Sequence, residues 1–124
     1  MSQFKEIITH EYQKLNTFEK RKELYNRFRL KFNDRLPIIC ELGKNCEQYY
    51  LDKYKYLVPY DLMVAQFMAI LRKRINIMPE VGLFLTVGNN EILNCSERFN
   101  TIYNNYKHND GFLYIIILAE NTFG

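Results

Sequence analysis

The amino-terminal third of the chain carries apolar residues every four positions. Leu24, Phe28 and Phe32 therefore share one face of a predicted helix over Phe18–Phe32, with Thr17 as its cap. The other positions of this segment are strongly basic, and they include Lys20, Arg21, Lys22, Arg27, Arg29 and Lys31. We expect these cations to form a solvated helix face, with contact to anionic lipid or an acidic cytoskeletal surface as the alternative.

The same helical spacing predicts two further helices. The first follows Asp61, its expected cap, and its apolar stripe consists of Val64, Phe67, Met68, Leu71 and Ile75. The second is shorter and follows Asn94, which forms a capping-box pattern with Glu97. Its inward residues are expected to be Phe99, Ile102, Tyr103 and Tyr106.

Alternating residues predict strands between these helices. The first strand has Leu36, Ile38, Cys40 and Leu42 on one face, and Arg35, Pro37, Ile39 and Glu41 on the other. The second, Tyr54–Val58, has Lys53, Lys55 and Leu57 on one face, and Tyr54, Tyr56 and Val58 on the other. Two more strands are predicted over Leu83–Val87 and Phe112–Leu118. The last is apolar on both faces, which suits a central strand.

The order of these elements is helix, strand, strand, helix, strand, helix, strand, which predicts the α+β class. Two strands followed by a helix and a strand are compatible with a β-grasp, in which a helix packs across a mixed sheet. The 124 residues suffice for one domain with one core.

Composition narrows the functional class. No stretch approaches the roughly 18 apolar residues of a membrane-spanning helix, and Met1–Ile8 lacks the apolar region of a secretory signal. The three cysteines, an odd number at irregular spacing, predict reduced thiols in a cytosolic protein. The formal net charge of +3 is mild and does not indicate nucleic-acid binding.

Catalytic patterns are missing from the sequence. His10 and His108 are far apart, Cys40 lies in an apolar strand face, and no cluster has the spacing of metal ligands. The five glycines form no phosphate-binding loop. We therefore expect a protein that is not an enzyme and that holds no cofactor or metal.

Two segments indicate binding instead. Lys53–Pro59 alternates charged and apolar residues and ends in proline, which is typical of a protected sheet edge or of a site where an extended peptide adds as a strand. The chain closes on Gly124. That end is either a frayed tail or a conjugation tail, because a glycine carboxylate without a Cβ can enter the narrow channel of a partner enzyme.

Several segments together resemble the autophagy ubiquitin-like modifiers, the family of the GABA-A receptor-associated protein and the microtubule-associated light chain proteins. They are "FEKRK", "FNDRLPIICE", "KYLVPYDL", "QFMAILRKRI" and "DGFLYIIILAENTFG". The matches keep their order from about Phe18 to Gly124. The resemblance implies a ubiquitin-like β-grasp, with a four-stranded mixed sheet and two additional amino-terminal helices. It implies a single domain over 1–124, divided into a helical part (1–32), a β-grasp core (33–119) and a flexible conjugation tail (120–124).

The resemblance also implies a function. Gly124 would be conjugated to phosphatidylethanolamine by activating and conjugating enzymes, and a cysteine protease would process and delipidate the chain. The protein would be cytoplasmic, and on autophagosomal or vacuolar membranes when lipidated. There it would bind cargo receptors and autophagy machinery through short motifs of an aromatic residue, two spacers and an aliphatic residue, which add beside the second strand.

Site residues follow from the same resemblance. The pocket for the aromatic residue would involve Leu24, Phe28, Pro37, Lys53, Lys55, Leu57 and Phe112. The pocket for the aliphatic residue would involve Tyr56, Val58, Pro59, Leu62, Phe67 and Ile70. Arg35 and Arg74, together with Lys53 and Lys55, would pair with acidic residues that flank the motif.

The chain also departs from the family pattern. Leu24 stands where relatives often carry an acidic residue, Tyr54 replaces a frequent basic residue, and Gly43–Asp52 matches poorly. An alternative function stays open, namely an unconjugated ubiquitin-like scaffold that binds cytoskeletal or trafficking proteins through the basic helix. A third is attachment to protein lysines instead of lipid.

Overall fold

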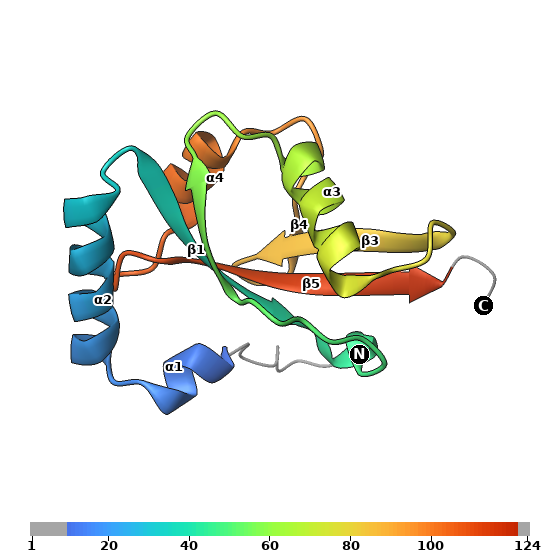
Figure 1. Ribbon diagram of the computed structural model, residues 1–124, viewed down its shortest axis with the longest axis horizontal. Helices are drawn as coiled ribbons and strands as arrows, with labels where there is room; N and C mark the ends of the chain where they lie inside the picture. Colours follow the sequence, from blue (N-terminus) through green and yellow to red (C-terminus); the bar gives the residue numbers. More distant parts are fainter. Residues whose placement is uncertain (1–9, 122–124) are drawn as a thin grey trace.

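A computed structural model describes residues 10–121 of the chain. Its elements, drawn in Figure 1, are α1 (Glu11–Leu15), α2 (Phe18–Lys31), β1 (Arg35–Leu42), the 3-10 helix η1 (Lys44–Cys46), β2 (Lys55–Pro59), α3 (Val64–Ile75), β3 (Val81–Val87), β4 (Glu91–Ile92), α4 (Phe99–Tyr106) and β5 (Leu113–Asn121). The two amino-terminal helices that the resemblance implies are both present as α1 and α2.

The strands form one five-stranded sheet in the order β2-β1-β5-β3-β4. β5 lies at its centre, parallel to β1 and antiparallel to β3, while β2 runs antiparallel to β1. The four predicted strands and their β-grasp arrangement are therefore confirmed. The sequence pattern does not predict β4, because a strand of 2 residues is too short to show alternation.

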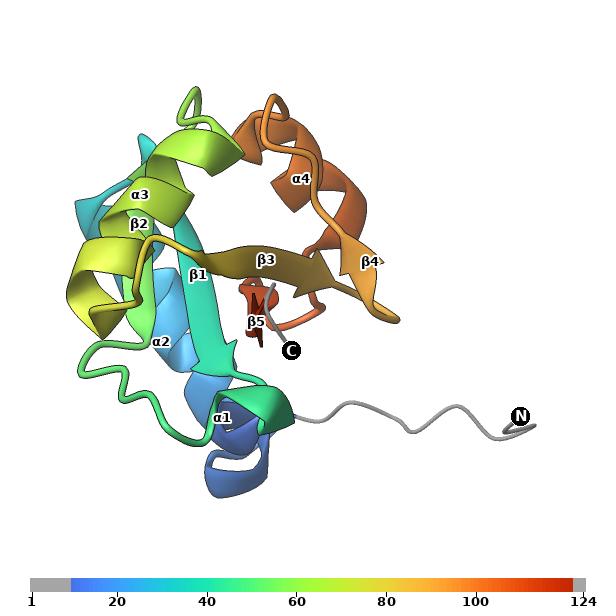
Figure 2. The same ribbon diagram turned by 90° about the vertical axis from the view of Figure 1, so that its right-hand side faces the viewer.

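The main core lies between one face of the sheet and helices α3 and α4. Inward residues of β1, β2 and β5, such as Ile38, Tyr56 and Ile115, contact Phe67 of α3 and Phe99 of α4 within one cluster of buried side chains. Figure 2 shows α3 and α4 together on this side of the central strands. The apolar stripe predicted for α3 packs as the helical spacing indicates. In α4, Phe99, Ile102 and Tyr103 are buried as predicted, but Tyr106, also predicted to point inward, is 37% exposed in the last turn of the helix.

The opposite face is covered by α1 and α2, and its core is smaller and aromatic. Ile39, Phe112 and Tyr114 of the sheet face Tyr12 of α1, and three partly buried residues of α2, Leu24, Tyr25 and Phe28, pack against them. β5 is therefore covered on both sides, as its two apolar faces predict. Phe32 lies beyond the end of α2 and is 41% exposed, so it does not extend the apolar face of that helix.

A buried ion pair fixes α2 to the loop before β5. Arg21 Nη1 lies 2.6 Å from Asp110 Oδ2, and the Tyr114 hydroxyl also donates to this carboxylate. Arg21 was expected on the solvated basic face, and that expectation is wrong because the side chain turns inward to neutralise a fully buried carboxylate. Gly111 lets the loop approach the helix: its φ is +99°, and a Cβ there would stand 2.3 Å from the Tyr25 ring.

Two helix caps predicted from the sequence are wrong. α3 begins after Met63, whose N–H donates to the Gln66 side chain at 2.9 Å, while Asp61 lies in the preceding turn. α4 begins after Arg98, one turn later than Asn94. Met63 and Arg98, the residues that directly precede the two helices, form an isolated β-bridge, a tertiary contact that local capping patterns do not reveal.

The ends of two strands also differ from those that the alternation predicts. β2 starts at Lys55, so Tyr54 precedes the strand instead of opening it. At the other end of the chain, β5 continues through Glu120 and Asn121, which pair with Gly82 and Val81. The sheet therefore extends two residues into the segment predicted to be a flexible tail.

Candidate functional site

β2 is an edge strand, and some of its main-chain N–H and C=O groups face away from the sheet. It pairs only with β1 among the described strands, in a register that places Ile38 opposite Tyr56. The Cys40 N–H donates to the Tyr54 carbonyl at 2.8 Å, and every second residue of an antiparallel ladder repeats this bonded pattern. The main-chain groups of Tyr56 and Val58 therefore point toward β1. Those of Lys55 and Leu57 point outward from the sheet.

On the α2 face, the structure brings together most of the residues predicted for the aromatic pocket. Phe112 is fully buried and meets Phe28 edge-on, with ring centroids 6.2 Å apart. Leu24 packs on the same cluster. Pro37 stands opposite Leu57 in the β1–β2 register. These residues form what we call the aromatic-side cluster.

Tyr12 of α1 also belongs to this cluster and was missed. Its ring lies 5.8 Å from that of Phe112, and the Lys55 amine lies 5.3 Å from its centroid. It stands in a helix of 5 residues, too short for apolar periodicity to reveal. The aromatic side chain of Tyr12 was the only signal in the sequence for its place in this cluster.

On the α3 face, the predicted aliphatic pocket is built around Tyr56, Val58 and Phe67. Tyr56 meets Phe67 edge-on at 5.2 Å, and all three side chains are at most 7% exposed. Leu62 is partly buried against them, whereas Ile70 remains 46% exposed on α3 and Pro59 is exposed at the strand end. We call this set the aliphatic-side cluster.

The Tyr56 hydroxyl is a buried polar atom without a hydrogen-bond partner in the described part of the chain. Burial raises the pKa of this phenol from 10.0 to about 12, and the nearby Cys40 adds to the shift. The hydroxyl therefore stays protonated and can donate a hydrogen bond.

The cations predicted to pair with acidic residues of the peptide lie in different surroundings. Arg35 lies within 3.5 Å of the Leu57 carbonyl at the open edge, while Arg74 forms an ion pair with Asp52 at 3.1 Å. The Lys53 amine lies 5.1 Å from the centroid of Tyr56, on the aliphatic side. The structure therefore does not bring Lys53 to the aromatic-side cluster, because the regular alternation ends where β2 begins.

Other predicted features have simpler outcomes. Gly124 lies outside the described residues. Cys40, Cys46 and Cys95 are free thiols, and burial raises the pKa of Cys40 well above its usual range. Over residues 10–121, no helix is long and apolar enough to cross a membrane, and no histidine, cysteine and carboxylate side chains gather as they do around a metal ion.

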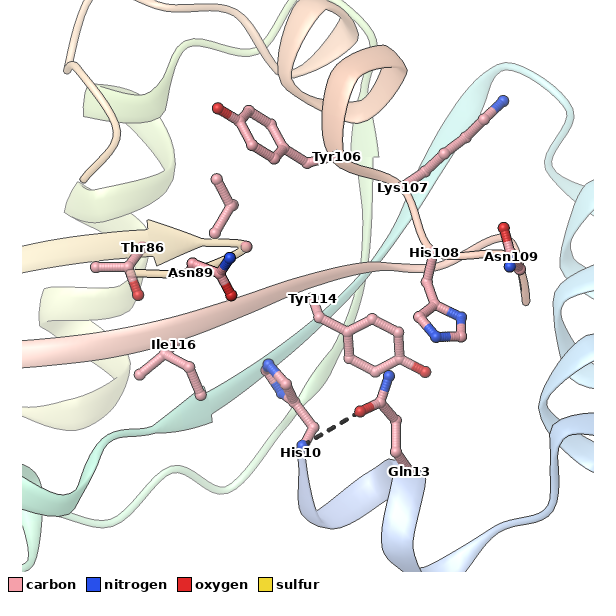
Figure 3. A pocket seen from close by; sticks show the side chains of 12 residues that line it. His10, Gln13, Thr86, Asn89, Tyr106, Lys107, His108, Asn109, Tyr114 and Ile116 are labelled. Atoms are coloured by element: carbon pink, nitrogen blue, oxygen red, sulfur yellow. Dashed lines mark hydrogen bonds between the residues drawn. The ribbon is translucent and has the colours of Figure 1, made fainter. Parts of the chain in front are cut away.

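A polar cavity of about 370 Å³ lies away from the β2 edge, between α1, the end of β3 and the loop before β5. Figure 3 shows His10, His108 and Tyr114 turned toward one another there, while the Lys107 amine points away. The His108 ring accepts a hydrogen bond from the Asp110 N–H at 3.1 Å, so that nitrogen is occupied by the loop.

Comparisons with known proteins agree with this architecture. A family model described as "Autophagy protein Atg8 ubiquitin like" matches residues 20–124. The Autophagy-related protein 8 of Pichia angusta is 48% identical over 108 residues, which cover 86% of this chain and 85% of that protein. That of Schizosaccharomyces pombe is 47% identical over 109 residues, 87% of this chain and 88% of the relative.

A solved structure is also similar. The crystal structure of Trypanosoma brucei ATG8 has a TM-score of 0.85 and 42% sequence identity, over 94% of this chain and 100% of that one. The family model and these relatives cover nearly all of the described elements. The chain is therefore a member of the Atg8 family of ubiquitin-like autophagy proteins.

Proposed function

We propose that this protein is a modifier conjugated through Gly124 to phosphatidylethanolamine on autophagosomal membranes, where it binds aromatic-x-x-aliphatic motifs of cargo receptors and autophagy machinery. The observation that carries the motif-binding part is the open edge of β2. Its outward main-chain groups lie between an aromatic-side and an aliphatic-side cluster on opposite faces of the sheet. Membership of the Atg8 family supports the conjugation part.

The spacing of the motif suits this edge. In an extended peptide, residues separated by three positions point to opposite faces, because side chains alternate with a period of two. An aromatic side chain directed toward Phe28 and Phe112 would thus leave the aliphatic one directed toward Val58 and Phe67. Main-chain pairing with Lys55 and Leu57 would supply affinity that depends little on sequence.

The peptide direction also follows from the two clusters. The aromatic-side cluster meets β2 at Lys55 and Leu57, whereas the aliphatic-side cluster meets it at Val58 and continues into Pro59 and Leu62. A motif that runs from aromatic to aliphatic would therefore lie parallel to β2. Acidic residues that flank the motif would form ion pairs with Arg35 or Lys55, and each exposed ion pair would add only about 0–1 kcal/mol to the binding free energy.

Conjugation would be carried out by partner enzymes. ATP would convert the Gly124 carboxyl to an acyl adenylate with release of pyrophosphate, and a cysteine thiol of the activating enzyme would displace AMP to form a thioester. The amine of phosphatidylethanolamine would then displace the thiol to form an amide. A cysteine protease would process the chain and hydrolyse that amide. The protein would then move between the cytoplasm and autophagosomal or vacuolar membranes.

A titration tests the motif-binding part. The chain has no tryptophan, so a peptide with a tryptophan-x-x-leucine motif reports binding through its own fluorescence. Leu57→Ala is expected to weaken binding by about 1–3 kcal/mol, and Leu30→Ala, at a residue 87% exposed on α2, is the matched control. Equal affinities of both variants and the unmodified chain would rule out the β2 edge.

Purified activating and conjugating enzymes with liposomes test the conjugation part. Gly124→Ala is expected to abolish the lipidated product while the peptide titration stays unchanged. Lipidation of that variant would contradict the proposal. If Gly124→Ala had no effect in cells and Arg27→Glu abolished partner recruitment, the unconjugated scaffold that acts through the basic face of α2 would be favoured instead.

A further inference from the structure

β5 has a neighbouring strand on only one side over its last residues. The β1–β5 register ends where Leu42 stands opposite Ile117, whereas the β3–β5 register continues until Val81 stands opposite Asn121. Among the described strands, residues 118–121 are therefore paired with β3 alone. A strand end that is held from one side separates from its sheet more easily than a strand end that is held from both sides.

A side chain from η1 takes the place of the missing strand. The Ile117 carbonyl accepts a hydrogen bond from the Gly43 N–H at 2.8 Å, so the main-chain groups of Ile117 face the β1 side of the strand. Because this direction alternates along a strand, the main-chain groups of Ala119 face the same side. The Asn45 amide donates to the Ala119 carbonyl at 2.8 Å. Asn45 therefore continues, through its side chain, the ladder that β1 leaves at Leu42.

A buried thiol fixes the orientation of the Asn45 amide. Cys46 Sγ lies 3.2 Å from Asn45 Oδ1 and 3.4 Å from the Ile117 carbonyl oxygen. Cys46 is buried, and this burial raises the pKa of its thiol, so the thiol stays protonated and can donate. Because Oδ1 accepts from the thiol, Nδ2 is directed toward Ala119. Both ends of the amide are thus engaged in contacts beside β5.

We propose that Asn45 is a positioning residue for conjugation. Its hydrogen bond keeps Ala119 and the two residues after it in the sheet, so that the root of the segment that carries Gly124 is already ordered when a partner enzyme binds it. This inference rests on the proposed function, because it takes the Gly124 carboxyl as the reacting group. If Glu120 and Asn121 separated from β3, the enzyme would have to order two more residues, and ordering residues weakens binding.

This role predicts which kinetic constant changes. An interaction that contributes equally to substrate binding and to the transition state affects KM and leaves kcat unchanged. Ala119 lies five positions before Gly124, away from the reacting carboxyl. Loss of its hydrogen bond should therefore raise the KM for this chain in adenylate formation. The stability of the fold should hardly change, because Asn45 is exposed and contributes one neutral hydrogen bond to β5.

ATP–pyrophosphate exchange by the purified activating enzyme measures these constants with the full chain as substrate. Asn45→Asp keeps the size of the side chain and the oxygen that accepts from Cys46, but it replaces the donor with an oxygen that repels the Ala119 carbonyl. KM is expected to rise about three- to tenfold at unchanged kcat. Asn45→Leu, which removes the donor without adding a charge, should have a smaller effect in the same direction.

Gln48→Glu is the matched control. It makes the same change from amide to carboxylate at an exposed residue shortly after η1, and both kinetic constants should stay unchanged. Hydrogen exchange tests the structural step directly, because alternation directs the Glu120 N–H toward Gly82 of β3. Exchange of this amide should become about three- to tenfold faster in Asn45→Asp, while exchange of the central Ile115 amide and the urea midpoint stay unchanged.

The outcomes separate this inference from the proposed function. No pyrophosphate exchange with the unmodified chain would contradict conjugation through Gly124 itself. Normal exchange with an unchanged KM for Asn45→Asp would contradict the positioning role alone. A rise in KM that Gln48→Glu shares would assign the effect to charge near η1. A fall in kcat together with a lower urea midpoint would assign Asn45 to the stability of the fold, and either of these last two results would also overturn the inference.

Discussion

The two sides of the sheet are built on different principles. The α3 and α4 side is a large cluster of apolar side chains, whereas the α1 and α2 side combines a small aromatic cluster with polar links from Arg21 to Asp110 and from Glu41 to α1. Apolar burial is nondirectional and tolerates small shifts, while a buried ion pair needs one geometry. The first side therefore supplies most of the stability, and the second fixes the position of α1 and α2, which border the proposed peptide-binding edge.

The largest effect is expected on the apolar side. Phe99→Ala removes a side chain with no exposed surface between α4 and the sheet, and should lower the free energy of unfolding by about 3–5 kcal/mol. Urea denaturation measures this difference, and Leu30→Ala at the α2 surface should change it by less than about 0.5 kcal/mol. A loss below about 1 kcal/mol for Phe99→Ala would show that the stability lies elsewhere.

A smaller but still large effect is expected at the buried ion pair. Arg21→Ala leaves the Asp110 carboxylate buried without its cation, which should cost about 3 kcal/mol. Arg27→Ala, on the exposed basic face of the same helix, is the matched control and should cost less than about 0.5 kcal/mol. Equal losses would contradict the distinction between Arg21 and its basic neighbours.

The double variant Arg21→Met with Asp110→Leu sharpens this test. It removes both charges and should recover part of the loss, because neither partner is then left charged in the interior. Recovery would be limited by the Phe112 N–H, which donates to Asp110 at 2.9 Å and would lose its acceptor. Hydrogen exchange of α2 amides reports whether the helix returns to its position.

The link from Glu41 to α1 predicts a pH dependence. Burial alone would raise the pKa of Glu41, but the nearby His10 and the N–H groups of Tyr12 and Glu11 outweigh it, so the pKa lies below its ordinary 4.5. The charged form is therefore favoured by folding. Its contribution is present above about pH 4.5 and is lost as the pH falls through the lowered pKa.

Glu41→Gln measures this contribution. Above pH 5 the variant should be less stable by about 1.5–3 kcal/mol, and its α1 amides should exchange faster. The difference from the unmodified chain should shrink on acidification below pH 4. A difference that stays constant from pH 7 to pH 3 would show that the carboxylate does not hold α1 through its charge.

The sequence predicts the apolar side better than the polar side, for a physical reason. Burial of Ile38 and Ile39 on opposite faces follows from alternation, which is a property of local geometry. The pairing of Arg21 with Asp110 joins residues 89 positions apart, and nothing local distinguishes Arg21 from the exposed cations around it. Local pattern thus assigns elements and faces but not tertiary partners.

The candidate site divides in the same way. Lys55, Leu57, Tyr56 and Val58 take the faces that alternation predicts, because they lie within β2. Lys53 and Tyr54 precede the strand, so extending the same alternation to them fails: Lys53 contacts Tyr56, and Tyr54 contacts Tyr12. The positions of Lys53 and Tyr54 could not be predicted for this reason, since both residues lie where the regular strand has not yet begun.

The smallest effect is expected at Tyr56, where the apolar side contains one unsatisfied hydroxyl. Tyr56→Phe removes a buried polar atom that has no partner among the described residues, so the free energy of unfolding near neutral pH should rise slightly or change by less than about 1 kcal/mol.

Above pH 10 the comparison of Tyr56→Phe with the unmodified protein becomes informative. The unfolded chain then ionises this phenol, while in the folded chain its pKa is about 12, so the unmodified protein loses stability between these values and Tyr56→Phe is spared that part of the loss. Urea denaturation at pH 8, 10 and 11 would reveal the divergence. Parallel curves for the two proteins would mean that the hydroxyl reaches solvent or a hydrogen-bond acceptor, and that the apolar side is less dry than its packing indicates.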